Sequence, residues 1–111
     1  MKVIWSEKID TVLSCGQPLF QIGINNWALT KEDALLVLDK LLEIQVPILG
    51  GDVYHKNGET FHSNYDNWYC DQIEGELNSD YVTRSIDVAR QYIINYQVET
   101  SNTVYFALIP E

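Results

Sequence analysis

Residues 47–63 read PILGGDVYHKNGETFHS, and they predict a β-hairpin. β-Branched and aromatic residues favour one strand over 48–55 and a returning strand over 59–63. The dipeptide Asn57-Gly58 between them suits the positive backbone dihedrals of a tight turn. Glycine weakens a strand, so we expect the pair Gly50-Gly51 to mark a bulge or the close approach of another chain segment.

Helical periodicity flanks the predicted hairpin on both sides. Upstream, Thr30 can cap a helix over 31–45, and downstream Asn78 or Ser79 can cap a longer helix over 79–97. A shorter helix is expected over 6–15, with Ser6 as its cap. The apolar residues that recur at spacings of three and four are Leu35, Leu38, Leu41 and Leu42 in the first long helix, and Val82, Ile86, Ala89, Ile93 and Tyr96 in the second.

The remaining segments divide into one strand and two loops. Residues 103–109 are rich in β-branched and aromatic side chains and stop at Pro110, which predicts a strand. Residues 17–24 and 64–77 show no clear period and are read mostly as loops. We therefore expect a single α+β domain over 1–111, in which a small, mainly antiparallel sheet packs against two longer helices and one short N-terminal helix.

Charge limits the classes of partner. The 111 residues carry a formal net charge of −9, with 46% hydrophobic residues and a pI near 4.4. This charge repels phosphate backbones and anionic lipid headgroups, so neither nucleic acid nor a membrane is expected as a partner. No basic segment followed by an apolar stretch marks the chain for secretion, so we expect a cytoplasmic protein whose Cys15 and Cys70 are reduced.

An acidic and aromatic segment is the strongest candidate for a binding site. No lysine or arginine occurs between Lys56 and Arg84. Aromatic side chains supply stiff contact area at interfaces, and carboxylates attract a basic partner. Alternatively, the aromatic side chains pack against the core and attach the segment to it, while the acidic side chains are only solvated. The residues predicted to contact a partner are Tyr54, Trp68, Asp71, Glu74, Glu76 and Asp80.

Two alternative interpretations are a small enzyme and a small structural or regulatory subunit. A small hydrolase or metal-dependent enzyme would use Asp52, His62 and Cys70, with His55 as another possible base for the thiol. His55 and Asp66 would complete a set of zinc-ligand types, but their spacing matches no standard site. No glycine-rich phosphate loop is present, and we expect no catalytic residue, no metal site and no cofactor.

Three motifs in the same order resemble the bacterial immunity protein forty family. They are Gly23-Ile24-Asn25-Asn26-Trp27-Ala28-Leu29, Pro47-Ile48-Leu49-Gly50-Gly51-Asp52-Val53-Tyr54 and Tyr65-Asp66-Asn67-Trp68-Tyr69-Cys70-Asp71. The similarity continues through Arg84-Ser85-Ile86 and Ala89-Arg90 into the last predicted strand, and so covers most of the chain after about residue 16.

The resemblance implies a non-catalytic protein that binds and neutralises a bacterial polymorphic toxin. Its expected partner is a cognate toxin domain with a basic surface, inhibited stoichiometrically, while the sequence specifies no oligomeric state. The resemblance carries no list of contact residues. We expect the polar motif residues Asn25, Asn26, Asp52, Asp66 and Asn67 to satisfy backbone groups rather than to touch a partner.

Overall fold

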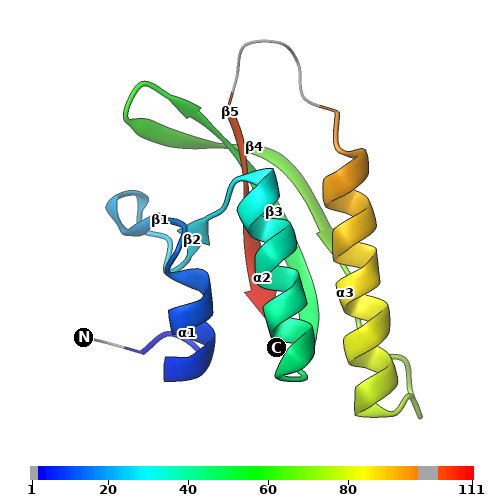
Figure 1. Ribbon diagram of the computed structural model, residues 1–111. Helices are drawn as coiled ribbons and strands as arrows, with labels where there is room; N and C mark the ends of the chain where they lie inside the picture. The colour runs from blue at the N-terminus through cyan, green and yellow to red at the C-terminus, as the bar shows by residue number, and fades with distance from the viewer. Residues whose placement is uncertain (1–2, 98–102) are drawn as a thin grey trace.

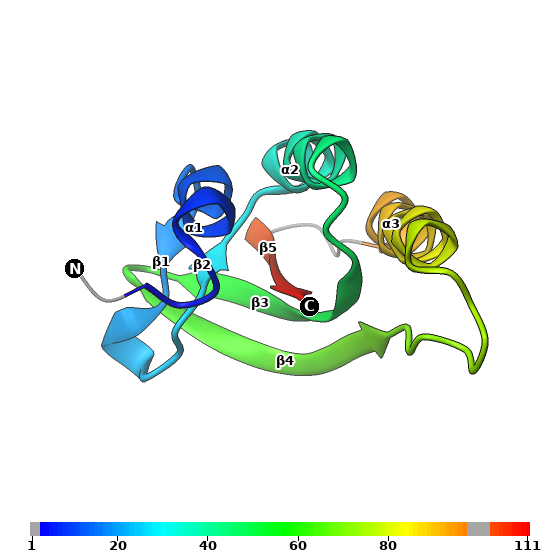
Figure 2. The ribbon, with the colours of Figure 1, turned by 90° about the horizontal axis from the view of Figure 1, so that it is seen from below.

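Three helices cover one face of an antiparallel sheet in the computed structural model, which describes residues 3–97 and 103–111 (Figure 1). The view in Figure 2 places α1, α2 and α3 side by side on the same side of the main sheet. The helical elements are α1 (Glu7–Leu13), the 3₁₀ turn η1 (Phe20–Ile22), α2 (Lys31–Glu43) and α3 (Asn78–Asn95). The strands are β1 (Gln17–Pro18), β2 (Trp27–Ala28), β3 (Ile48–Asn57), β4 (Thr60–Tyr69) and β5 (Thr103–Pro110). The predicted α+β class is confirmed.

The main sheet has the strand order β4-β3-β5, and both pairs are antiparallel. The short strands β1 and β2 form a separate pair, which is joined to β5 by two backbone hydrogen bonds between Leu29 and Phe106. The long central strand β3 therefore lies between a strand that follows it directly and the strand that closes the chain. β4 is an outer strand.

The predicted helices are present with small shifts at their ends. Ser6 Oγ accepts a hydrogen bond from Ile9 N, and Thr30 Oγ1 accepts one from Asp33 N, so both predicted caps are confirmed. α3 begins one residue earlier than expected, with Leu77 in the cap position and no side-chain cap. The prediction that Asn78 or Ser79 caps this helix is therefore wrong, because both residues already lie within it.

Apolar side chains from the two faces of the sheet enter two separate clusters. Successive side chains of a strand point to opposite faces, so Phe106 and Leu108 enter the core under the helices, whereas Tyr105 and Ala107 point the other way. The smaller cluster contains Leu19, Ala28, Tyr54, Phe61, Tyr105 and Ala107. The loop expected over 17–24 thus includes β1 and η1, and it supplies Leu19 to this second cluster.

β4 is longer than predicted. The expected return strand over 59–63 extends to Tyr69, so the prediction of a loop over 64–77 is wrong for 64–69. Pairing shifts between Asp52 and Tyr54, where β4 carries an irregular segment opposite β3. The bulge disrupts the apolar and polar alternation that would identify a strand. The hairpin turn is also shifted by one residue, because Asn57 pairs with Thr60 and only Gly58 of the predicted pair has positive φ, at 65°.

The glycine pair of β3 makes room for Trp68. A Cβ on Gly51 would lie 2.2 Å from the Trp68 ring, and one on Gly50 would lie 2.3 Å from the Trp68 carbonyl oxygen. Both distances are far below a van der Waals contact, so neither position accommodates a side chain. The expected close approach is confirmed, and the approaching group is a tryptophan of the neighbouring strand. Pairing with β5 also shifts between Ile48 and Gly50.

We predict that Gly51→Ala lowers the free energy of unfolding by about 1–3 kcal/mol, the usual cost of overpacking a core. In a Trp68→Leu background, which removes the ring, the same change should cost less than about 1 kcal/mol. Urea denaturation of the four proteins in this double-mutant cycle measures both values. Equal costs in the two backgrounds would contradict the assignment of the glycine to the indole.

Candidate functional site

The loop between β4 and α3, residues 70–77, is held in place by Arg84 of α3. Its Nε and Nη2 atoms donate to the two carboxylate oxygens of Glu76, each at 2.8 Å. Nη2 also donates to the carbonyl oxygen of Asp71 at 2.7 Å, and Nη1 contacts Cys70 Sγ at 3.0 Å. One guanidinium therefore joins both ends of the loop to the helix that follows it.

Further hydrogen bonds stiffen this loop. Tyr81 Oη donates to the Cys70 carbonyl at 2.7 Å, and Cys70 N donates to Leu49 O of β3. Glu76 accepts a third hydrogen bond, from Ile73 N at 3.1 Å. The Arg84 guanidinium and this backbone N–H lower the pKa of the Glu76 carboxyl to about 2. Glu76 is thus charged over most of the pH range, and its side chain is only 12% exposed.

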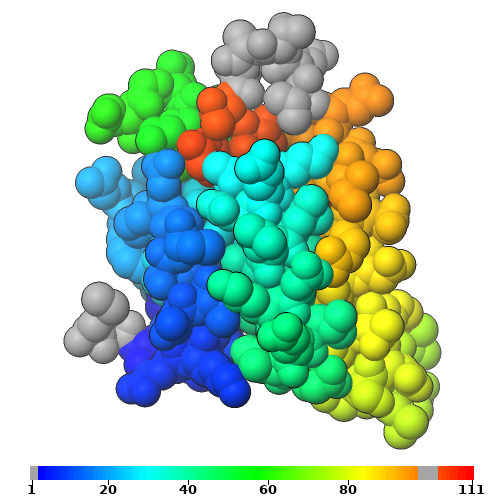
Figure 3. All heavy atoms as spheres, in the orientation of Figure 1, coloured from blue at the N-terminus to red at the C-terminus, as the bar shows by residue number. Residues whose placement is uncertain are grey.

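Three large apolar side chains in or next to the loop are exposed to solvent and are not packed in the core. Tyr69 is 75% exposed, Ile73 60% and Leu77 67%. Asp71, Glu74 and Asp80 are exposed around them. In the space-filling view the yellow-green part of the chain before α3 projects at the lower right of the molecule (Figure 3). We call the surface formed by Tyr69, Asp71, Ile73, Glu74, Leu77 and Asp80 the loop surface.

The six residues predicted to contact a partner fall into two groups. Asp71, Glu74 and Asp80 are exposed and belong to the loop surface as defined above, so their contact with a partner stays a prediction. Tyr54 and Trp68 lie in the core, 5% and 8% exposed, and offer little area to a partner. Glu76 forms an ion pair with Arg84, and this pair stabilises the loop rather than facing a partner.

Sequence reasoning missed Ile73 and Leu77. Both are large apolar residues in a segment that was read as an acid-rich loop without period. A large apolar residue in a loop cannot be explained by the buried face of a helix or strand, so its presence among acidic residues could have indicated an exposed contact residue. Tyr69 belongs to the third motif, but its exposure depends on the strand register, which puts it on the face opposite Trp68.

Of the five polar motif residues expected to satisfy backbone groups, Asn26 and Asn67 do so, whereas Asp66 bonds to a side chain. Asn26 is buried; its side chain donates to Leu108 O at 2.8 Å and accepts from Trp27 N at 2.7 Å. Asp66 accepts a hydrogen bond from Tyr96 Oη at 2.5 Å. Burial and this bond raise the pKa of Tyr96 to about 12. Asn67 donates to the carbonyl oxygen of Tyr65.

The residues of the enzymatic reading are not brought together. His55 and His62 stack across the hairpin with ring centroids 5.6 Å apart, whereas Cys70 lies beyond the opposite end of β4, a separation of roughly 20 Å along a strand. Asp52 is half-buried in the middle of β3, where burial raises its pKa. Within residues 3–97 and 103–111, no group of three or more histidine, cysteine or acidic side chains is placed to hold a metal ion.

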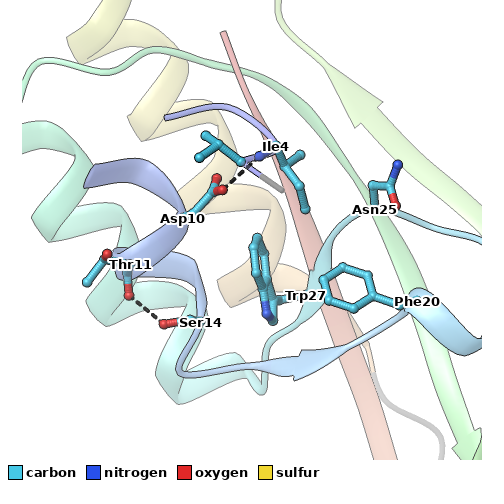
Figure 4. A pocket seen from close by; sticks show the side chains of 8 residues that line it. Ile4, Asp10, Thr11, Ser14, Phe20, Asn25 and Trp27 are labelled. Carbon is cyan, nitrogen blue, oxygen red and sulfur yellow. Dashed lines mark hydrogen bonds between the residues drawn. The ribbon is translucent and has the colours of Figure 1, made fainter. Parts of the chain in front are cut away.

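A separate hollow of about 740 Å³ lies between α1 and the segment before β2. Figure 4 shows Trp27 between Phe20 on one side and Thr11 and Ser14 on the other, with Ile4 next to the indole. The carboxylate of Asp10 faces the same region but is already occupied, since it accepts hydrogen bonds from Ile4 N and Trp5 N. The hollow therefore has a mainly apolar lining and no side chain arranged for catalysis.

The chain is a small α+β domain in which Arg84 holds an exposed loop that carries acidic and apolar side chains. A family model described as Immunity protein 40 matches residues 18–110. The chain belongs to this immunity protein family, and the resemblance inferred from the three motifs is confirmed. Comparisons with curated proteins and with solved structures gave no match.

The family indicates a role in toxin neutralisation and a toxin protein as partner. The matched region contains the whole loop surface, the sheet, α2 and α3, whereas α1 precedes it. Among the described helices, none is long and apolar enough to span a membrane.

The Glu76 carboxyl gives a pH-dependent contribution to stability. Its folded pKa lies below the unfolded value near 4.5, so the contribution is complete above about pH 4.5 and is lost as the pH falls through about 2. We predict that Glu76→Gln destabilises the protein at pH 7 and that the difference from wild type disappears near pH 2. Urea denaturation at pH 7, 4.5 and 2 measures this difference in the free energy of unfolding.

Glu74→Gln is the matched control, because Glu74 is an exposed glutamate of the same loop without a hydrogen bond to Arg84. It should leave the stability at pH 7 within about 0.5 kcal/mol of wild type. A wild-type advantage over Glu76→Gln that was as large at pH 2 as at pH 7 would contradict the role of the charged pair.

Proposed function

We propose that this protein neutralises a cognate bacterial toxin by forming a stoichiometric complex through the loop surface. The observation that supports the proposal is that residues 69–77 combine hydrogen bonds that hold the backbone in place with exposed apolar side chains. The loop is fixed by Arg84, yet Tyr69, Ile73 and Leu77 are all at least 60% exposed. A loop ordered before binding loses little conformational entropy on binding, so exposed apolar groups on it are effective anchors.

The charge around these anchors favours a basic partner. Arg84 is the first cation after Lys56, and Glu76 neutralises it. In the described part of the chain, the exposed carboxylates of Asp71, Glu74 and Asp80 therefore form no salt bridge. Such a field steers an oppositely charged protein toward the surface and sets its orientation.

The roles of the sequence-predicted residues follow from their positions. Asp71, Glu74 and Asp80 provide electrostatic attraction, while Glu76 maintains the loop conformation. Because little of Tyr54 or Trp68 reaches the surface, we assign anchoring to Tyr69, Ile73 and Leu77 instead. Inhibition would follow by covering the toxin's active site or its substrate entry, and a toxin that acts on nucleic acid would present a suitable basic surface.

The apolar contribution is tested by Ile73→Ala against Leu36→Ala. Both side chains are 60% exposed, but Leu36 lies on α2, away from the loop. We expect Ile73→Ala to weaken binding of the toxin domain encoded beside this gene by about tenfold or more, the range of an interface hot spot. Leu36→Ala should bind like wild type, as measured by calorimetric titration. Equal affinities of the two variants would overturn the anchoring role.

The electrostatic contribution is tested by Glu74→Lys against Glu59→Lys. Both glutamates are exposed, and Glu59 lies in the hairpin turn at the far end of β4. We expect Glu74→Lys to slow association and to reduce its dependence on salt between 50 and 300 mM NaCl, because a rim charge acts mainly on the encounter. Glu59→Lys should change both quantities less. Stopped-flow measurements give the association rate and its salt dependence for each protein. Identical salt dependence in the wild type and both variants would count against an acidic binding face.

A further inference from the structure

β4 offers an unpaired backbone edge beside the loop surface. The sheet order is β4-β3-β5, so one edge of β4 pairs with β3, and within the described residues no strand occupies the other. Unpaired strand edges can pair with an extended segment of another protein through main-chain hydrogen bonds.

The register identifies which backbone groups are available. Cys70 N donates to Leu49 O, so Cys70 and, two residues earlier, Trp68 direct their backbone groups toward β3. The residues between and before them, Tyr69 and Asn67, must direct their N–H and C=O groups away from β3. Both residues are also exposed. The end of β4 nearest the loop therefore presents two donors and two acceptors in the spacing of a strand.

In the bulge that precedes Asn67, side chains of β4 accept hydrogen bonds from the backbone N–H groups of the same strand. Tyr65 N donates to Ser63 Oγ at 3.1 Å, and Asp66 N donates to Asn64 Oδ1 at 3.0 Å. Tyr65 has a left-handed backbone, with φ 68°, and its carbonyl accepts from Asn67 Nδ2. The bulge thus satisfies its polar groups locally, and next to the loop the available edge consists of Asn67 and Tyr69.

Side chains of an added strand would have a surface to contact on the helix side. Trp68 stacks on Tyr92 of α3 with ring centroids 4.6 Å apart, and Tyr92 stands close to Tyr96, at 5.8 Å. These two tyrosines line a mainly apolar groove of about 560 Å³ along α3. The other residues lining the groove are Asp87, Val88, Gln91, Asn95 and Gln97.

We propose that an extended, basic segment of the toxin adds to the sheet by pairing with β4 at Asn67 and Tyr69. The charge indicates this occupant, because Asp71 and Glu74 follow the free edge and Asp87 lines the groove beside it. Alternate side chains of the segment would contact the α3 groove and Tyr69. This mode of binding rests on the proposed function and specifies how the loop surface is extended into the sheet.

Amide hydrogen exchange followed by NMR tests the pairing directly. In the free protein, the Asn67 and Tyr69 amides should exchange at least tenfold faster than those of Trp68 and Cys70, because only the latter are bonded to β3. In the complex with the toxin domain encoded beside this gene, exchange at Asn67 and Tyr69 should slow by at least tenfold. A complex in which both amides still exchange as in the free protein would overturn strand addition and leave the loop-surface proposal intact.

A backbone variant provides a second measurement. Tyr69→Pro removes one outward N–H, which an edge strand tolerates, whereas Tyr69→Ala removes the side chain and keeps that donor. We expect the proline variant to bind at least tenfold more weakly than the alanine variant. Equal affinities would contradict the pairing, and if the proline variant does not fold, the exchange rates of the wild-type complex decide. Failure of the wild-type protein to bind the toxin domain would overturn the proposed function and this inference together.

Discussion

The contact between Trp68 and Gly51 positions the outer strand β4 against both the central strand β3 and the helix α3. The indole occupies the space that a side chain at residue 51 would need, and its other face stacks on Tyr92 of α3. It thereby fixes the end of the outer strand both to the central strand and to the longest helix. Among the described residues, its buried Nε1 has no hydrogen-bond acceptor, a cost of about 1–3 kcal/mol that the burial of a large aromatic ring offsets.

The position of the loop follows from this contact. Once Trp68 is fixed, Cys70 bonds to Leu49, and the chain leaves the sheet next to the first turns of α3. Arg84 can then reach both ends of residues 70–77, and the acidic loop is ordered by a single cation. The core aromatics and the exposed apolar residues of the loop thus have separate roles, the first in stability and the second in proposed recognition.

Local signals in the sequence were sufficient for the helices, their first two caps and the hairpin. The end of β4 was not predictable in the same way, because its strand identity depends on pairing with residues 50–52 across a bulge. The glycine pair indicated a close approach, but only the fold identifies Trp68 as the partner. Likewise the sequence marked the acids of the loop, whereas the internal role of Glu76 depends on Arg84, which reaches it from the next helix.

The bulge at residues 64–66 also bears on how the protein behaves at high concentration. A long, flat strand edge would allow two copies of the chain to join their sheets and to aggregate. Here the bulge interrupts the edge, and a second copy pairing beside the loop would bring its own Asp71 and Glu74 near those of the first. With a net charge of −9 on each molecule, self-association is opposed at the same place where an oppositely charged strand is favoured. The negative charge therefore disfavours pairing with a second copy at this edge and favours pairing with a positively charged strand of another protein.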